Sequence, residues 1–125
     1  MQTYTNELWY YAEYQSFRLD SEETWYTLHV SGYSGDAGDS LSNTTLPLIL
    51  QQNGVNFSTY DADHDKRYPG SCAVSNGAGW WFGNCGYSYL TCVYGSDVFS
   101  WLSLDTYGLE DSGRLRAARM MIRSV

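Results

Sequence analysis

Two short stretches of alternating apolar residues near the start of the chain constrain its fold most. Over residues 8–19, aromatic and aliphatic side chains recur at every second position, which is the period of a β-strand. A second strand is predicted over residues 25–30, where Tyr26, Leu28 and Val30 share one face. The five residues between them are mostly polar, so we expect an antiparallel hairpin.

The rest of the chain favours short strands separated by long loops. Residues 31–42 are rich in Gly, Ser and Asp and predict a loop or a short helical turn. Asn53-Gly54 is a strong turn signal before a further apolar stretch over residues 55–60. Residues 114–125 fit either a short helix or a strand. Helical periodicity is weak throughout, so we expect a β-rich chain.

Length and charge exclude several classes of protein. The chain has 125 residues, enough for one domain with a real core. It carries 7 basic and 14 acidic residues, a net charge of −7. This charge argues against nucleic acid and anionic membrane surfaces as partners, and it favours the binding of cations. The sequence contains no run of 18 apolar residues, the length that a membrane-spanning helix needs. Residues 1–6 lack the features of a signal peptide, so we expect a mature chain or a piece of a longer one.

An acidic segment is the best candidate for a metal site. Asp61, Asp63 and Asp65 stand at every second position, a spacing that lets several oxygens converge on one hard cation. An EF-hand is excluded, because Lys66 and Cys72 occupy the places of its glycine and its last glutamate. From spacing alone, a calcium site and a solvated acidic turn remain equal alternatives.

The three cysteines leave one without a partner inside the chain. Cys72 and Cys85 bracket a segment of small residues, which indicates a disulfide loop in a secreted chain and two reduced thiols in a cytosolic one.

The sequence contains no motif that indicates catalysis. His29 falls in a strand and His64 falls in the acidic segment, and neither belongs to a nucleophile motif.

Two sites match the N-glycosylation pattern, at Asn43-Thr44-Thr45 and Asn56-Phe57-Ser58. The pattern is short and frequent by chance. Asn43 is the better candidate, because it falls in a predicted loop.

Several stretches, taken in order, form one specific pattern. The rhythm of residues 12–30 leads directly into a Gly-Tyr-Ser-Gly segment. The stretches are residues 12–30, 32–41 (GYSGDAGDSL), 53–59 (NGVNFST), Cys72-Ala73, 79–85 (GWWFGNC) and 115–123. They cover nearly the whole chain, and in this order they resemble the fibrinogen C-terminal domain family, which includes ficolins, tachylectins and angiopoietins.

The resemblance implies an α+β fold of fibrinogen C-terminal type, mainly antiparallel sheet with a loop-rich calcium and ligand subdomain. Residues 1–125 would form a single partial domain, with the central sheet in 8–60 and 114–125 and the loop subdomain in 61–113. It also implies a secreted, non-enzymatic module that binds Ca²⁺. Its partners would be a glycan, an acetylated ligand or an extracellular protein. The resemblance is also compatible with a homo-oligomer.

The resemblance also assigns site residues. Calcium would be held by the carboxylates of Asp63 and Asp65 and by backbone carbonyls at the next alternate positions, Arg67 and Pro69, with Gly70 as the alternative last ligand. Cys72 and Cys85 would form a disulfide and leave Cys92 free or bonded to another chain. The bond that enters Cys85 is cis in some relatives. The ligand pocket would comprise Asn76, Asn84, Cys85, Gly86 and Tyr94.

Two departures from the family keep a second hypothesis open. The complete family domain begins well upstream of Ala12, and Gly86 stands where the family usually has His. The missing imidazole removes a polar contact from the pocket. The alternative is therefore a truncated structural or regulatory fragment that keeps calcium but has lost ligand binding.

Overall fold

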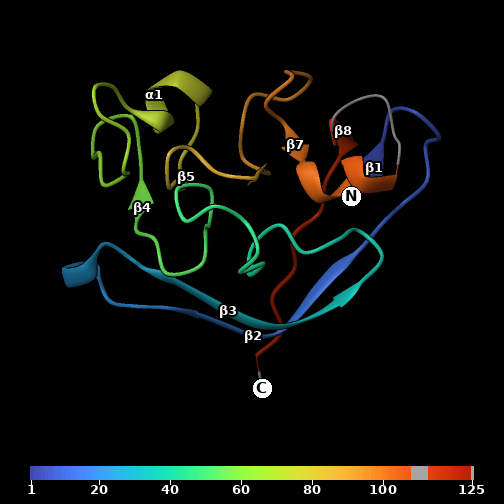
Figure 1. The fold of residues 1–125 in the computed structure, drawn as a ribbon, viewed down its shortest axis with the longest axis horizontal. Coiled ribbons are helices and arrows are strands. Elements are labelled where there is room, and N and C mark those ends of the chain that lie inside the picture. Colours follow the sequence, from blue (N-terminus) through green and yellow to red (C-terminus); the bar gives the residue numbers. More distant parts are fainter. Residues whose placement is uncertain (108–112, 125) are drawn as a thin grey trace.

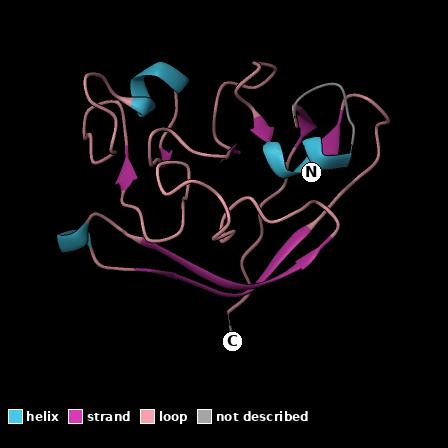
Figure 2. Ribbon diagram, in the orientation of Figure 1, coloured by secondary structure: helices cyan, strands magenta, loops and turns pink. Residues whose placement is uncertain are grey.

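The computed structural model describes residues 1–107 and 113–124 (Figures 1 and 2). Short strands joined by long loops dominate, as expected. In chain order the elements are β1 (Gln2–Thr3), β2 (Ala12–Leu19), the 3-10 helix η1 (Glu22–Thr24), β3 (Leu28–Gly35), β4 (Phe57–Ser58), α1 (Cys72–Asn76), β5 (Trp80–Trp81), β6 (Ser88–Tyr89), β7 (Ser100–Trp101), the 3-10 helix η2 (Leu102–Tyr107) and β8 (Leu115–Ala117). The described strands form four two-stranded antiparallel sheets, β1–β8, β2–β3, β4–β5 and β6–β7.

The predicted hairpin is present, but its second strand is shifted along the chain. Strands β2 and β3 pair from Leu19 opposite Leu28 to Ala12 opposite Gly35. Trp25 and Tyr26 have φ angles of 52° and 53°, so they form the turn and not the strand. The strand instead continues through the segment predicted as a loop, because its backbone completes the ladder with β2.

The first strand begins later than residue 8. The carbonyl oxygen of Tyr11 accepts hydrogen bonds from the N–H groups of Asp36 and Ala37, both at 3.0 Å, and this contact closes the open end of the hairpin. Gly35 has φ 135°, and a Cβ there would lie 2.2 Å from the same oxygen. Glycine is therefore required at this position.

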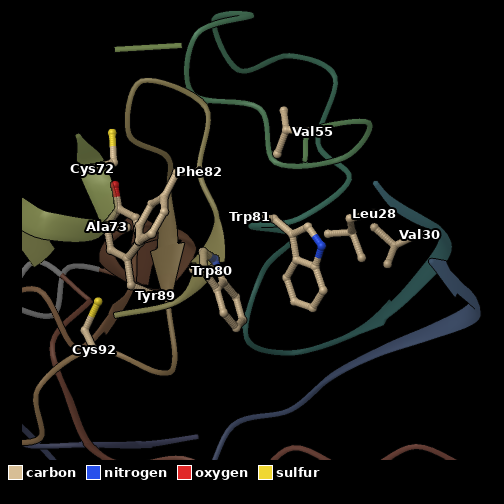
Figure 3. Close-up of a cluster of buried hydrophobic side chains, with 10 residues drawn as sticks. All are labelled: Leu28, Val30, Val55, Cys72, Ala73, Trp80, Trp81, Phe82, Tyr89 and Cys92. Carbon is tan, nitrogen blue, oxygen red and sulfur yellow. The ribbon is translucent and has the colours of Figure 1, made fainter. Parts of the chain in front are cut away.

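The core lies on the concave side of the β2–β3 hairpin (Figure 1) and contains the adjacent tryptophans of β5 (Figure 3). Both Trp80 and Trp81 are buried, and the Trp81 indole N–H donates to the carbonyl of Tyr26 at 2.9 Å. This cluster comprises Leu28, Val30, Val55, Cys72, Ala73, Trp80, Trp81, Phe82, Tyr89 and Cys92. A second buried cluster comprises Ala37, Phe99, Trp101, Leu104 and Leu115.

A fully buried glutamine joins two segments of the first cluster. The Gln52 side-chain N–H₂ group donates to the carbonyls of Trp81 at 3.2 Å and Ser88 at 2.8 Å. Its oxygen accepts from the backbone N–H of Ser88 at 3.0 Å and from the Ser88 hydroxyl at 2.8 Å. Because all four bonds are buried, Gln52 fixes the spacing between β5 and β6.

The Gly-Asp-Ser part of the family signature forms a tight polar turn. The Asp39 carboxylate accepts from the backbone N–H groups of Leu41 and Ser42 and from the hydroxyl of Tyr14 at 2.9 Å. Burial and the neighbouring Asp39 carboxylate raise the pKa of Tyr14. The Ser40 hydroxyl lies 2.6 Å from that of Ser103, so the turn is anchored to η2.

The end of the described chain contains a strand and no helix. Residues 115–117 form β8, and residues 118–124 have no regular structure, so the helical alternative for this region is wrong. Within residues 1–107 and 113–124, no helix has the length and apolar character needed to span a bilayer.

Candidate calcium and ligand loops

The acidic loop, residues 61–70, begins with a tight backbone turn. Thr59 and Ala62 exchange two backbone hydrogen bonds, of 3.0 and 3.2 Å. The Thr59 hydroxyl donates to the Asp61 carboxylate at 2.7 Å across the same turn. Asp61 therefore has a structural role at the entrance to the loop.

Asp63 and Asp65 each fold the backbone that follows them. Asp63 Oδ1 accepts from the backbone N–H of Asp65 at 3.2 Å, and Asp65 Oδ1 accepts from that of Arg67 at 2.7 Å. Asp65 Oδ2 accepts from the backbone N–H of Cys72 at 2.6 Å. A carboxylate oxygen can accept more than one contact, so these bonds orient both groups and leave lone pairs for a cation.

The neighbouring residues hold the acidic loop against the core. The backbone N–H of His64 donates to the hydroxyl of Ser58 at 2.9 Å, and its ring stacks on Trp25 with centroids 4.3 Å apart. The backbone N–H of Lys66 donates to the carbonyl of Gly83 at 3.0 Å. The loop is thus fixed on both sides of Asp65.

Arg67 and Pro69 offer only their carbonyls to a cation. The Arg67 guanidinium donates to the hydroxyl of Ser75 on α1 at 2.9 Å. Pro69 follows a cis peptide bond and has no N–H group. Within the described parts of the chain, no group of three or more His, Cys, Asp or Glu side chains is placed to hold a metal ion. A cation here would therefore need two carboxylates with backbone oxygens, a donor set of the kind that suits Ca²⁺.

The Cys72–Cys85 disulfide is present, with the two Cα atoms 5.4 Å apart. Cys72 begins α1, whose N-cap is Ser71; the Ser71 hydroxyl accepts from the backbone N–H of Val74 at 3.3 Å. Cys92 is free and buried in the first core cluster, so it is not placed to bond another chain. Burial raises the pKa of the Cys92 thiol to about 11.

Four of the five expected ligand residues lie around this disulfide. The Asn76 side chain donates to the carbonyl of Cys72 at 2.9 Å, at the end of α1. The Asn84 side chain is exposed, and its backbone N–H donates to the carbonyl of Ile49 at 2.6 Å. The Asn84–Cys85 peptide bond is cis, as the resemblance implies. Tyr94 is 72% exposed, and its ring packs on Phe99 with centroids 5.8 Å apart.

Gly86 is buried and has no room for a side chain. Its φ is 152°, and a Cβ would lie 2.8 Å from Nε2 of Gln52. Its carbonyl accepts from the Tyr89 hydroxyl at 2.9 Å. The structure thus explains the glycine at this position, because a histidine would displace the buried Gln52 side chain.

An open pocket of about 440 Å³ lies beside the turn that begins the acidic loop, and the sequence did not indicate it. Its lining residues come from this turn and from the segment between α1 and β5. They are Thr59, Tyr60, Asp61, Gly77, Ala78 and Gly79. The Gly-Ala-Gly run, which removes bulk opposite an exposed tyrosine, is the signal that could have identified it.

Comparison with known proteins gives a consistent result. The family model described as the C-terminal globular domain of fibrinogen beta and gamma chains matches residues 2–122. Fibrinogen-like protein 1 of Homo sapiens is 39% identical over 93 residues, which are 72% of this chain and 30% of that protein. Techylectin-5A of Tachypleus tridentatus is 42% identical over 84 residues, 67% of this chain and 26% of that protein.

A solved structure extends the likeness to the fold. The fibrinogen-like globe domain of human ANGPTL2 superposes with a TM-score of 0.71 at 32% sequence identity. The match covers 93% of this chain and 51% of that domain. The chain thus spans between about a quarter and a third of those two curated relatives, and about half of the solved domain.

Proposed function

Because this chain belongs to the family of the fibrinogen C-terminal globular domain and has its fold, we propose that it is a secreted, calcium-binding recognition module of lectin type. Its ligand would be a glycan or an acetylated group, with an extracellular protein as the alternative partner. One relative, Techylectin-5A, is a lectin by name. Since the chain spans only part of its relatives, this activity is a proposal for the segment itself.

The geometry of the acidic loop carries the calcium part of the proposal. Asp65 is held by backbone N–H groups on both sides, at 2.7 Å from Arg67 and 2.6 Å from Cys72. The second bond ties the loop to the first residue of the disulfide-closed helix. Asp63, Asp65 and the carbonyls of Arg67 and Pro69 would hold the ion, which would supply a fixed positive charge beside the ligand loop.

The first test is a calcium titration followed by thermal unfolding. Extracellular calcium modules have dissociation constants on the order of 10⁻⁴ to 10⁻³ M, so about 10 mM calcium should stabilise the fold by about 1.4–2.7 kcal/mol. For a domain of this size, the melting temperature should rise by about 5–10 °C.

Replacement of Asp63 and Asp65 by Asn should abolish this rise, because Asn keeps the side-chain acceptor oxygen but removes the charge. Asp61→Ala is the matched control and should retain the rise, since Asp61 bonds Thr59 at the loop entrance. If the melting temperature of the folded wild-type chain does not change with calcium, the calcium site is refuted. An unchanged response in the double variant would place the site elsewhere.

The residues around the disulfide support the recognition part of the proposal. Asn84 presents an exposed amide beside Cys85, while its backbone is fixed to Ile49. Neither histidine supports an enzymatic alternative. The His29 ring lies 2.7 Å from an Asp20 carboxylate oxygen in a partly buried pair, and the His64 ring stacks on Trp25.

The second test compares binding to beads that carry N-acetylglucosamine with binding to beads that carry glucosamine. We expect retention on the acetylated beads alone, and loss of calcium should weaken it. Asn84→Ala should weaken binding by about tenfold, the effect of one lost polar contact of about 1.4 kcal/mol. Ser34→Ala, at an exposed position on β3, should bind as wild type. Equal retention on both kinds of bead would favour the alternative of a calcium-binding fragment without ligand recognition.

A further inference from the structure

Asn43 begins a turn in which its side chain contacts the second residue after it. Asn43 Oδ1 accepts from the backbone N–H of Thr45 at 2.9 Å and from the Thr45 hydroxyl at 2.6 Å. The backbone N–H of Leu46 donates to the Asn43 carbonyl at 3.4 Å and closes the turn. The amide oxygen is thus engaged by both donors of the third residue in an Asn-x-Thr sequence.

This arrangement has a chemical consequence for the amide nitrogen. A hydroxyl that donates to Oδ1 withdraws electron density from the amide and favours loss of a proton from Nδ2. Asn-x-Thr is the acceptor sequence for N-linked glycosylation, and such sites lie in surface turns. Thr44 and Thr45 are both exposed. Asn43 itself is partly exposed. The acceptor geometry is therefore present in the folded chain, in a turn at the surface.

The loop that follows Asn43 carries exposed apolar side chains. Leu48 is 76% exposed and Ile49 is 54% exposed. The Gln51 side chain donates to the carbonyl of Leu46 at 2.7 Å and holds this loop in shape. A glycan on Asn43 would project from a formed surface loop that otherwise presents apolar side chains to water.

The second acceptor sequence in the chain lacks these properties. Asn56 Oδ1 accepts from the hydroxyl of Thr27 at 2.8 Å, in a different part of the chain. Its hydroxyl residue, Ser58, is fully buried in β4, and the Ser58 oxygen accepts from the backbone N–H of His64 at 2.9 Å. In the folded chain, Ser58 is inaccessible and its oxygen already has a partner.

We propose that Asn43 is the N-glycosylation site of this protein and that Asn56 stays unmodified. In the transfer, Nδ2 forms a bond to the anomeric carbon of an oligosaccharide carried on a lipid pyrophosphate. The bond from that carbon to the pyrophosphate oxygen breaks, the lipid pyrophosphate leaves, and Nδ2 gives up one proton to a base of the transferring enzyme. The proposal rests on secretion, which belongs to the proposed function.

The test directs the full chain into the secretory pathway of cultured animal cells with an added leader and measures the intact mass of the secreted protein. Wild type should carry one glycan, and peptide N-glycosidase should remove it and convert the acceptor asparagine to aspartate at position 43. Asn43→Gln and Thr45→Ala should each lack the glycan, whereas Asn56→Gln should keep it.

Two variants address the same site, so a folding defect in one leaves the other to decide. An unglycosylated wild type, a glycan that persists in Asn43→Gln or Thr45→Ala, or a second glycan at Asn56 would overturn the assignment. Because the added leader supplies secretion, this result is independent of calcium and sugar binding. Failure of the proposed function and failure of the glycosylation site are therefore distinguishable.

Discussion

Replacing Gln52 by Ala is expected to lower the free energy of unfolding by about 3 kcal/mol, a large fraction of the roughly 5–15 kcal/mol that holds a domain together. The variant removes four buried hydrogen bonds at once. It leaves the N–H and hydroxyl of Ser88 and two backbone carbonyls without their partner. Each buried polar group left unsatisfied costs about 1–3 kcal/mol, and water entering the new cavity would offset part of the total.

Urea denaturation measured by tryptophan fluorescence checks this prediction. Gln51→Ala is the matched control, because it removes the same side chain from the adjacent position. The Gln51 amide donates to the carbonyl of Leu46 in a partly buried loop, so its loss should cost less than about 1 kcal/mol. Equal effects of the two substitutions would mean that the Gln52 network does not connect β5 to β6 as described.

Removing the disulfide is expected to have an effect of similar size. A double replacement of Cys72 and Cys85 by Ala should lower the free energy of unfolding by about 3 kcal/mol, the value of the chain-entropy model for a loop of about 15 residues. The two cysteines are 13 residues apart. Urea denaturation of the oxidised wild type and the double variant gives the difference.

Peptide mapping without reduction should also recover Cys72 linked to Cys85. Cys92 provides an internal control, since it is 7% exposed and burial raises its pKa to about 11. Iodoacetamide at pH 8 should leave it unlabelled in the native protein and label it after unfolding in guanidinium. A linkage between Cys85 and Cys92, or rapid labelling of native Cys92, would contradict this arrangement.

The sequence was a good guide where a local rule decides the structure. The two-residue alternation predicted β2 and the existence of the hairpin, and the ordered family motifs predicted the fold. The exact bounds of β3 were not predictable in this way. Trp25 and Tyr26 are aromatic residues with a high strand propensity, but their positive φ angles place them in the turn. The partner strand outweighs local preference here.

In the candidate sites, too, local patterns were predictable from the sequence and contacts between distant residues were not. The every-second spacing of Asp63 and Asp65 predicted either a cation loop or an acidic turn. The structure adds that each carboxylate accepts a hydrogen bond from the backbone N–H two residues later. The restriction at Gly86 was not visible, because it arises from Gln52, 34 positions away in the sequence. Polar residues in a core have no periodicity that marks them. Only the fold shows that Gln52 occupies this space.

The pairing of β1 with β8 has a consequence for the order in which the protein can assemble. Gln2 lies opposite Ala117 and Thr3 opposite Leu115, so this sheet joins residues separated by more than 110 positions. The hairpin β2–β3, by contrast, needs only residues 12–35. During synthesis, β1 therefore cannot pair with β8 until almost all of the described chain has been made. Contacts of such long range close large loops, and they slow folding relative to a chain of local contacts. The hairpin can form early, but Leu28 and Val30, which are buried in the complete fold, stay uncovered until their core partners Trp80 and Trp81 have been made.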